Sequence, residues 1–142
     1  MMPTQLKHAA ITHDILTAFY DAYNALGYGF VESVYTAALE QELRARSHAV
    51  AREYAVHVIY KGTPIAFQRV DMLVDDTIVV EIKASAAVPP FAERQLLNYL
   101  RGTNLEVGLL LHSGPKPWFK RVVSFNRAGG GLGSIDGRGS NE

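Results

Sequence analysis

The chain has 142 residues, of which 48% are hydrophobic and 20% are charged, values that fit one globular domain. Its 14 basic residues balance its 14 acidic residues, which excludes a strongly basic nucleic-acid binder of the histone kind but not a local basic patch. It has no cysteine, which excludes disulfides, cysteine zinc sites and thiol nucleophiles. No apolar run approaches the ~20 residues of a membrane span and no signal peptide is visible, so we expect a cytoplasmic protein without membrane contact.

The first part of the chain shows helical spacing of its apolar residues. Over 4–26 these residues recur every three or four positions, and Gly27 follows as a helix stop. A short break over 28–30 separates this segment from a second segment with an apolar stripe, 31–46. The side of this segment that would face solvent carries Glu–Arg pairs four residues apart. We therefore expect two consecutive helices.

The apolar period changes to two at residue 50. The predicted strands cover 50–60, 64–74, 77–83, 107–112 and 119–125, and one further helix covers 91–102. The run 77–83 is apolar on both faces until its end, which is typical of a central strand. The order α-α-β-β-β-α-β-β predicts an α/β fold with a mixed sheet flanked by helices.

The composition shifts near residue 126. The segment 126–142 holds half of the chain's twelve glycines, and such a segment cannot bury enough apolar surface to offset its ordering entropy. We expect one domain over 1–125 and a flexible Gly/Ser-rich tail over 126–142.

Two acids and a lysine come together in the predicted central strands. Glu81 and Lys83 are two residues apart and share one face of their strand, while Ile82 points the other way. If the preceding turn is 75–77, residue i faces residue 152 − i and Asp71 stands opposite Glu81, whereas a two-residue loop would put Asp71 on the wrong face. Two carboxylates supply oxygen ligands for Mg²⁺, and a lysine can orient or deprotonate a water and stabilise charge on phosphorus. From spacing alone, a Glu–Lys surface pair beside a solvated aspartate fits equally well.

Three further side chains could complete such a site. Gln95 and Tyr99 are four residues apart on the predicted helix 91–102 and share one of its faces. An amide can hold a water or a phosphate oxygen, and a tyrosine can hydrogen-bond a neighbour or stack on a base. The alternative is an exposed glutamine beside a half-buried tyrosine. Glu32 begins the second helix and could add a third acid over the metal, or simply complement the helix dipole.

A small basic cluster lies near the end of the predicted domain. Lys116, Lys120 and Arg121 have Trp118 and Phe119 between them, a combination that could grip a nucleic-acid backbone and stack on a base. A solvated strand end with a core tryptophan explains the same residues. The five histidines have no pair at the four-residue spacing of a helical metal site, so we expect them to be structural or exposed.

The segment Gly29-Phe30-Val31-Glu32-Ser33-Val34-Tyr35 resembles the pattern that names the GxxExxY proteins, which belong to the PD-(D/E)XK nuclease superfamily. The resemblance extends over roughly 10–125. The further matching blocks, in family order, are 26–30, 60–62, 69–74, 80–84, 95–100, 107–111 and 119–121. Val70 stands where the superfamily's name has proline, a departure that many members share.

The resemblance implies a restriction-endonuclease-like α-β-β-β-α-β core, preceded by an extra N-terminal helix. By the same resemblance, Asp71 and Glu81 take the two metal-ligand positions and Lys83 takes the catalytic position. Glu32 matches the helix glutamate that joins the site. Residues 95–99 are similar to the Q-x-x-x-Y element of RecB-like members, which implies functional roles for its glutamine and tyrosine.

The function implied is that of a metal-dependent nuclease that hydrolyses phosphodiester bonds, with Mg²⁺ as its cofactor and Mn²⁺ as a substitute. The implied partner is nucleic acid, with DNA favoured over RNA. The resemblance leaves open whether the protein forms a homo-oligomer. A different class of function also fits: a catalytically silent module that keeps the nuclease fold and binds nucleic acid or a protein. The zero net charge favours this alternative, because it gives little non-specific affinity for phosphates.

Overall fold

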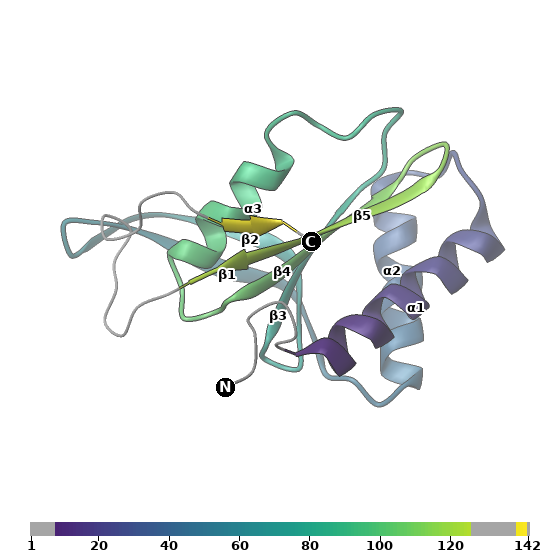
Figure 1. The fold of residues 1–142 in the computed structure, drawn as a ribbon, viewed down its shortest axis with the longest axis horizontal. Coiled ribbons are helices and arrows are strands. Elements are labelled where there is room, and N and C mark those ends of the chain that lie inside the picture. The colour runs from purple at the N-terminus through teal and green to yellow at the C-terminus, as the bar shows by residue number, and fades with distance from the viewer. Residues whose placement is uncertain (1–7, 126–138, 142) are drawn as a thin grey trace.

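The computed structural model describes residues 8–125 and 139–141 of the chain. They form a six-stranded sheet in the order β1-β2-β3-β4-β5-β6, with α1 and α2 packed on one face and α3 on the other (Figure 1). The elements are α1 (Ala9–Leu26), α2 (Glu32–Ala45), β1 (Val50–Tyr60), β2 (Thr63–Val74), β3 (Ile78–Lys83), α3 (Ala92–Arg101), β4 (Val107–Ser113), β5 (Pro117–Ser124) and β6 (Gly139–Asn141). The predicted α/β fold and the element order up to β5 are confirmed, with boundaries that move by at most two residues apart from the start of α1.

Each face of the sheet has its own apolar core, because neighbouring residues of a strand point in opposite directions. Leu109 of β4 packs in the core with α1 and α2, whereas Leu110 packs in the core with α3. Helix α3 comes so close to β4 that a Cβ at Gly108 would lie 2.9 Å from Leu96. Glycine at this position therefore sets the distance between the helix and the sheet.

Strands β3 and β4 form the centre of the sheet. They are parallel and joined by the α3 crossover, while the other described strand pairs are antiparallel. Every residue of β4 is buried, and so is every residue of β3 except Lys83 at its end. The prediction of a central strand over 77–83 is confirmed.

The turn between β2 and β3 sets the register on which the predicted site depends. Val74 pairs with Ile78, so the loop is 75–77, and its first two residues have φ angles of 52° and 55°. Both are aspartates, which adopt this left-handed conformation more readily than most residues. Residue i therefore faces residue 152 − i, as predicted for this loop, over the paired residues from Val74 opposite Ile78 to Met72 opposite Val80. Asp71 and Glu81 are the next residues along the two strands, and Glu81 Oε1 accepts a hydrogen bond from the Asp71 backbone N–H.

His48 ties this turn to the rest of the molecule. Its ring nitrogens lie 2.5 Å from Asp75 Oδ2 in the turn and 2.8 Å from Asp14 Oδ2 on α1. The hydrogen bond to Asp75 is the main cause that raises the pKa of His48, and the bond to Asp14 adds to it, while burial acts in the opposite direction. This histidine is structural, as expected from the sequence.

The far part of the β1–β2 hairpin, residues 54–69, projects beyond the helices as a two-stranded arm (Figure 1). Its turn is made by Lys61 and Gly62, with φ angles of 49° and 80°. Residues 61–69 are all exposed, so neither face of this part of β2 is covered by the described remainder of the fold. A two-stranded ribbon has little core of its own, and its position depends on the strands at its base.

The expected flexible tail falls mostly on residues outside the described part of the chain. Gly139–Asn141, however, form β6, which pairs antiparallel with the end of β5. The sequence analysis missed this strand, because pairing with an open sheet edge requires no apolar pattern. None of the helices that the structure describes has both the length and the apolar character needed to cross a bilayer.

Candidate active site

Two carboxyl groups bridge β2 and β3 at the point where the strands part. The backbone pairs between these strands end at Met72 and Val80. One residue further on, Glu81 Oε1 accepts a hydrogen bond from the Asp71 backbone N–H at 2.7 Å, and Asp71 Oδ2 accepts one from the Ile82 backbone N–H at 2.6 Å. The carboxyl groups therefore replace the carbonyls of the ladder, each satisfying a backbone donor of the opposite strand.

The surroundings of this carboxyl pair resist its ionisation. Glu81 is only 7% exposed. The pKa of Glu81 is raised to about 7: burial is the largest cause and the charge of Asp71 adds to it, while the Asp71 N–H and the ammonium of Lys83 act in the opposite direction. Burial is also the largest cause that raises the pKa of Asp71. A cation beside both groups would favour their ionised forms.

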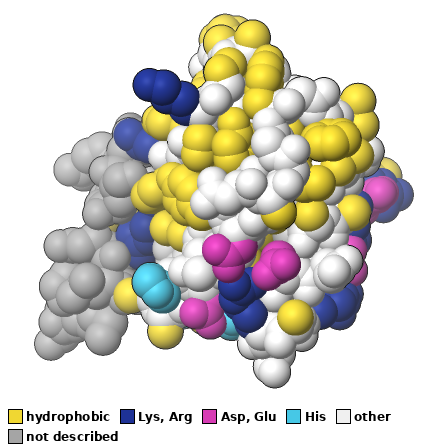
Figure 2. Space-filling view, turned by 90° about the vertical axis from the view of Figure 1, so that its right-hand side faces the viewer, with side chains coloured by type: hydrophobic (Ala, Val, Ile, Leu, Met, Phe, Trp, Pro, Cys, Tyr) yellow, Lys and Arg dark blue, Asp and Glu magenta, His cyan; other side chains and the backbone are white. Residues whose placement is uncertain are grey.

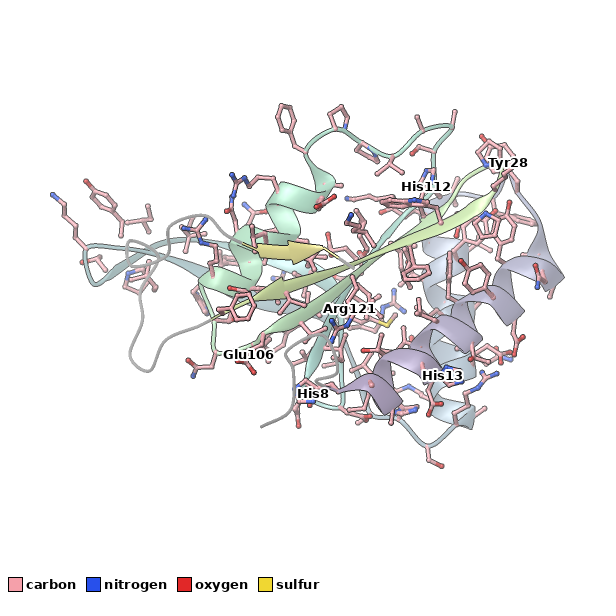
Figure 3. All side chains as sticks on the ribbon, in the orientation of Figure 1. His8, His13, Tyr28, Glu106, His112 and Arg121 are labelled. Carbon is pink, nitrogen blue, oxygen red and sulfur yellow. The ribbon has the colours of Figure 1, made fainter. Side chains whose placement is uncertain are left out.

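Lys83 lies beside the carboxyl pair. Its Nζ is 4.0 Å from Glu81 Oε2, on the face of β3 that the two-residue spacing requires. The side chain is partly exposed, at the end of an otherwise buried strand. Its partner in register on β4 is the buried His112, which Figure 3 labels. The ammonium thus stands where solvent meets the carboxyl pair.

Glu32 is the first residue of α2 and lines a pocket together with Asp71. The pocket has a volume of about 390 Å³ and lies between α2 and the strands β1 and β2. Glu53 and Arg69 add further charged groups to its lining. The charge of Glu32 contributes to the raised pKa of Glu81, so it acts on the carboxyl pair electrostatically.

The glycine and tyrosine of the GxxExxY segment hold this helix start in place. Gly29 has a φ angle of 116°, a conformation that other residues rarely adopt. The Tyr35 hydroxyl donates a hydrogen bond to the Gly27 carbonyl at 2.5 Å and accepts one from the Phe30 N–H at 3.3 Å. The break between α1 and α2 is thereby fixed to the first turn of α2, which carries Glu32.

Helix α3 covers the face of the sheet to which Glu81 points, because Glu81 is two residues from Val79, which packs in the core with α3. Gln95 and Tyr99 line a pocket of about 400 Å³ between α3 and the arm, together with His57 and Gln68. Tyr99 is buried; burial raises its pKa, and the charges of the two carboxyl groups raise it further. Gln95 is exposed and, within the described part of the chain, makes no hydrogen bond to either carboxyl group.

A comparison with protein families accounts for this arrangement. The family model described as the PD-(D/E)XK nuclease superfamily matches residues 9–122, which is more than half of the chain. The chain belongs to the PD-(D/E)XK nuclease superfamily. The match extends from α1 to β5, so it includes all the site residues predicted on the sheet and on helices α2 and α3. Searches of the curated proteins and of the solved structures found no match.

PD-(D/E)XK nucleases typically use divalent metal ions, and the carboxyl pair fits one kind of ion better than another. Within the described residues, no three His, Cys, Asp or Glu side chains gather around one metal position. Asp71 and Glu81 each give one oxygen to a backbone N–H and have a second oxygen that these hydrogen bonds do not use. Mg²⁺ binds through one or two carboxylates and completes its shell with waters and phosphate oxygens, whereas zinc takes three or four protein ligands. The pair therefore fits Mg²⁺.

The predicted basic cluster is not one surface in this PD-(D/E)XK domain. Lys120 and Arg121 are neighbours on β5 and point to opposite faces of the sheet. Arg121, labelled in Figure 3, is only 6% exposed, so it is not available to a nucleic-acid backbone, and Lys116 lies apart in the exposed turn before β5. Figure 2, which shows the side of the molecule with α1 and α2, has acidic and basic side chains close together and no broad basic face.

The sequence analysis missed three charged residues of the α2 pocket, Arg52, Glu53 and Arg69. Arg69 could have been found, because it precedes Asp71 by two residues on the same strand. Glu53 could not, because it has a φ angle of 50° inside β1, and nothing in the local sequence requires this irregularity.

Proposed function

We propose that this chain is a metal-dependent nuclease that hydrolyses phosphodiester bonds in nucleic acid. The observation that carries the proposal is the carboxyl pair of Asp71 and Glu81 with the ammonium of Lys83 at 4.0 Å, in a chain of the PD-(D/E)XK superfamily. Two acids and a lysine at a strand end are the groups that phosphodiester hydrolysis with a metal needs. Membership of the superfamily makes nucleic acid the substrate class that the proposal names.

The residues take distinct roles in this proposal. Asp71 and Glu81 hold Mg²⁺, or Mn²⁺ in its place, which when bound supplies positive charge against the phosphate and polarises water. Lys83 orients or deprotonates the attacking water and stabilises charge that develops on the phosphate oxygens. Glu32 supports the pair from the α2 pocket, which it shares with Asp71.

The residues on α3 act from the face of the sheet opposite to α2 and Glu32. Gln95 is exposed on the pocket wall, where its amide can orient a phosphate oxygen or a water. Tyr99 is buried close enough for both carboxyl charges to raise its pKa, which supports a role in positioning them. Together with Gly29, Glu32 and Tyr35, these residues support membership of the GxxExxY proteins and a RecB-like subtype. The proposal places DNA ahead of RNA as the substrate.

The test is cleavage of single- and double-stranded DNA and RNA with Mg²⁺ or Mn²⁺, with an EDTA control. We expect metal-dependent cleavage that Lys83→Ala and Asp71→Asn both lose. Asp76→Asn is the matched control, because Asp76 is an exposed aspartate in the turn that follows β2 and makes neither of the hydrogen bonds of the carboxyl pair. Cleavage that persists in Lys83→Ala, or that is lost equally in Asp76→Asn, would contradict the proposed roles.

The second candidate is a binding module that keeps the fold without cutting. It is favoured by the hydrogen bonds that already occupy one oxygen of each carboxyl group, which could make the pair a purely structural bridge. Titration calorimetry with Mg²⁺ and Mn²⁺ separates the two candidates. A nuclease should bind the metal ion and lose this binding in Asp71→Asn. A binding module should give no metal-binding signal, either as the wild type or as Asp71→Asn.

A further inference from the structure

The arm carries exposed aromatic rings, each next to a cation. The Phe67 ring is 51% exposed, and the Arg69 guanidinium lies 5.3 Å from its centre. Near the tip, the Tyr60 ring is 58% exposed, and Lys61 Nζ lies 5.5 Å from its centre. Among the described residues, neither cation has a carboxylate within ion-pair distance. The arm thus presents two ring–cation pairs to solvent.

The Phe67–Arg69 part of this surface is continuous with the candidate active site, and Tyr60 and Lys61 lie at the tip of the arm. Phe67 and Arg69 are two residues apart on β2 and share one face of the strand, where the His57 ring lies 6.3 Å from the Phe67 ring. Arg69 also lines the α2 pocket together with Asp71 and Glu32. A ligand that lies along the arm therefore reaches the carboxyl pair without leaving β2.

The chemistry of a ring beside a cation matches that of one nucleotide, whose flat base and negative phosphate would contact the two groups together. Every base has a face that can stack on an aromatic ring, but a duplex covers these faces with its own neighbours. Duplex binding depends mainly on neutralising phosphates, and this chain has zero net charge and only two unpaired cations on the arm. The arm therefore fits an unpaired strand better than a duplex.

We propose that the arm binds an unpaired strand of nucleic acid and leads it to the carboxyl pair. Bases stack on Tyr60 and Phe67, while phosphates contact Lys61 and Arg69. The inference rests on the proposed nuclease function and names its substrate class. It assigns recognition to β2, which also supplies Asp71, in place of the cluster at 116–121 that the sequence predicted.

The test measures binding without cleavage, using the full chain in EDTA. Fluorescence anisotropy with a labelled oligothymidylate of about 20 nucleotides is compared with a duplex of equal length. Stacking on a single ring is worth enough that Phe67→Ala and Tyr60→Ala should each weaken single-strand binding about fivefold or more. Arg69→Ala should also reduce the salt dependence. Phe125→Ala is the matched control, because Phe125 is 47% exposed and directly follows β5, which β3 and β4 separate from the arm in the sheet.

The outcomes separate this inference from the proposed function. Binding that requires Phe67 and Tyr60, without cleavage in the presence of any metal, supports the binding role of the arm and contradicts the proposed nuclease function. If the protein cleaves nucleic acid with a metal and the arm variants bind as tightly as the wild type, the proposed nuclease function is supported and the proposed binding role of the arm is contradicted. Tighter binding of the duplex than of the single strand contradicts the proposal that the arm prefers an unpaired strand. Sedimentation adds one more check: a dimer that becomes a monomer in Phe67→Ala, with oligonucleotide affinity unchanged, would mean that a second copy covers the arm instead. Circular dichroism of each variant confirms that the fold is intact.

Discussion

Replacing Glu81 with glutamine should stabilise the metal-free protein while removing its cleavage activity. The folded protein buries the Glu81 carboxyl group beside that of Asp71, and both effects disfavour its charged form. Glutamine keeps the shape of the side chain, and its carbonyl can accept the hydrogen bond from the Asp71 N–H. The substitution therefore removes a buried charge without opening a cavity.

The size and the pH dependence of this gain follow from the change in pKa. A carboxyl group whose pKa rises from 4.5 to about 7 on folding destabilises the folded state by about 3 kcal/mol above pH 7. Between pH 4.5 and 7 the folded protein binds more protons than the unfolded chain, so the free energy of unfolding falls as the pH rises. Below this range the destabilisation disappears, because both states hold the proton.

Urea unfolding in EDTA at pH 5 and at pH 8 measures the effect. We expect Glu81→Gln to raise the free energy of unfolding by about 3 kcal/mol at pH 8 and by less than about 1 kcal/mol at pH 5. The exposed Asp76→Asn, as the control, should change little at either pH. A gain of equal size at both pH values, or a loss at pH 8, would refute the reasoning. Adding Mg²⁺ at pH 8 should stabilise the wild type more than Glu81→Gln, because only the wild type offers two carboxylates.

Three further predictions concern residues that hold the fold and the site. The protonated form of His48 stabilises the fold below pH 6.5, and this contribution is lost as the pH rises through the raised folded-state pKa. His48→Gln should thus lower the free energy of urea unfolding by about 1 kcal/mol at pH 6 and hardly change it at pH 9. Gly108→Ala should lower stability by about 1–3 kcal/mol, because the new Cβ would lie 2.9 Å from Leu96; an unchanged melting temperature would contradict this. Tyr35→Phe removes the hydroxyl that fixes the first turn of α2, so we expect the free energy of unfolding to fall by about 1 kcal/mol. We also expect a lower kcat, because Glu32 in this turn would be displaced, and an unchanged kcat would contradict that link.

The pairing of Asp71 with Glu81 could be predicted from the sequence, because it depends only on local rules. Strand side chains alternate with a period of two, and the turn length then fixes which residues face each other. Two aspartates and a threonine between two apolar runs left few turn lengths to choose from. The loop 75–77 is the one that brings the acids together, and the structure has it.

The prediction of one basic surface that includes Lys120 and Arg121 set the same rule aside. Adjacent residues of a strand cannot share a face, so the period of two already argued against one basic surface there.

The arm, in contrast, could not be predicted from the sequence. Its ring–cation pairs depend on how far the hairpin extends beyond the helices, which no pattern within 50–74 reveals. The left-handed conformation of Glu53 inside β1 is likewise not indicated by the residues around it in the sequence.

The carboxyl pair has two tasks in this fold, and they require different tests. Where β2 and β3 part, each carboxyl group replaces a missing backbone acceptor, so Asp71→Ala would leave the Ile82 N–H without its partner. Loss of activity in that variant could therefore reflect a local change in structure rather than a lost ligand. Asp71→Asn and Glu81→Gln keep an acceptor at each position and remove only the charge. A chain that folds as well or better with these changes, yet no longer binds a divalent ion, would separate the role of the charge from the role of the hydrogen bond.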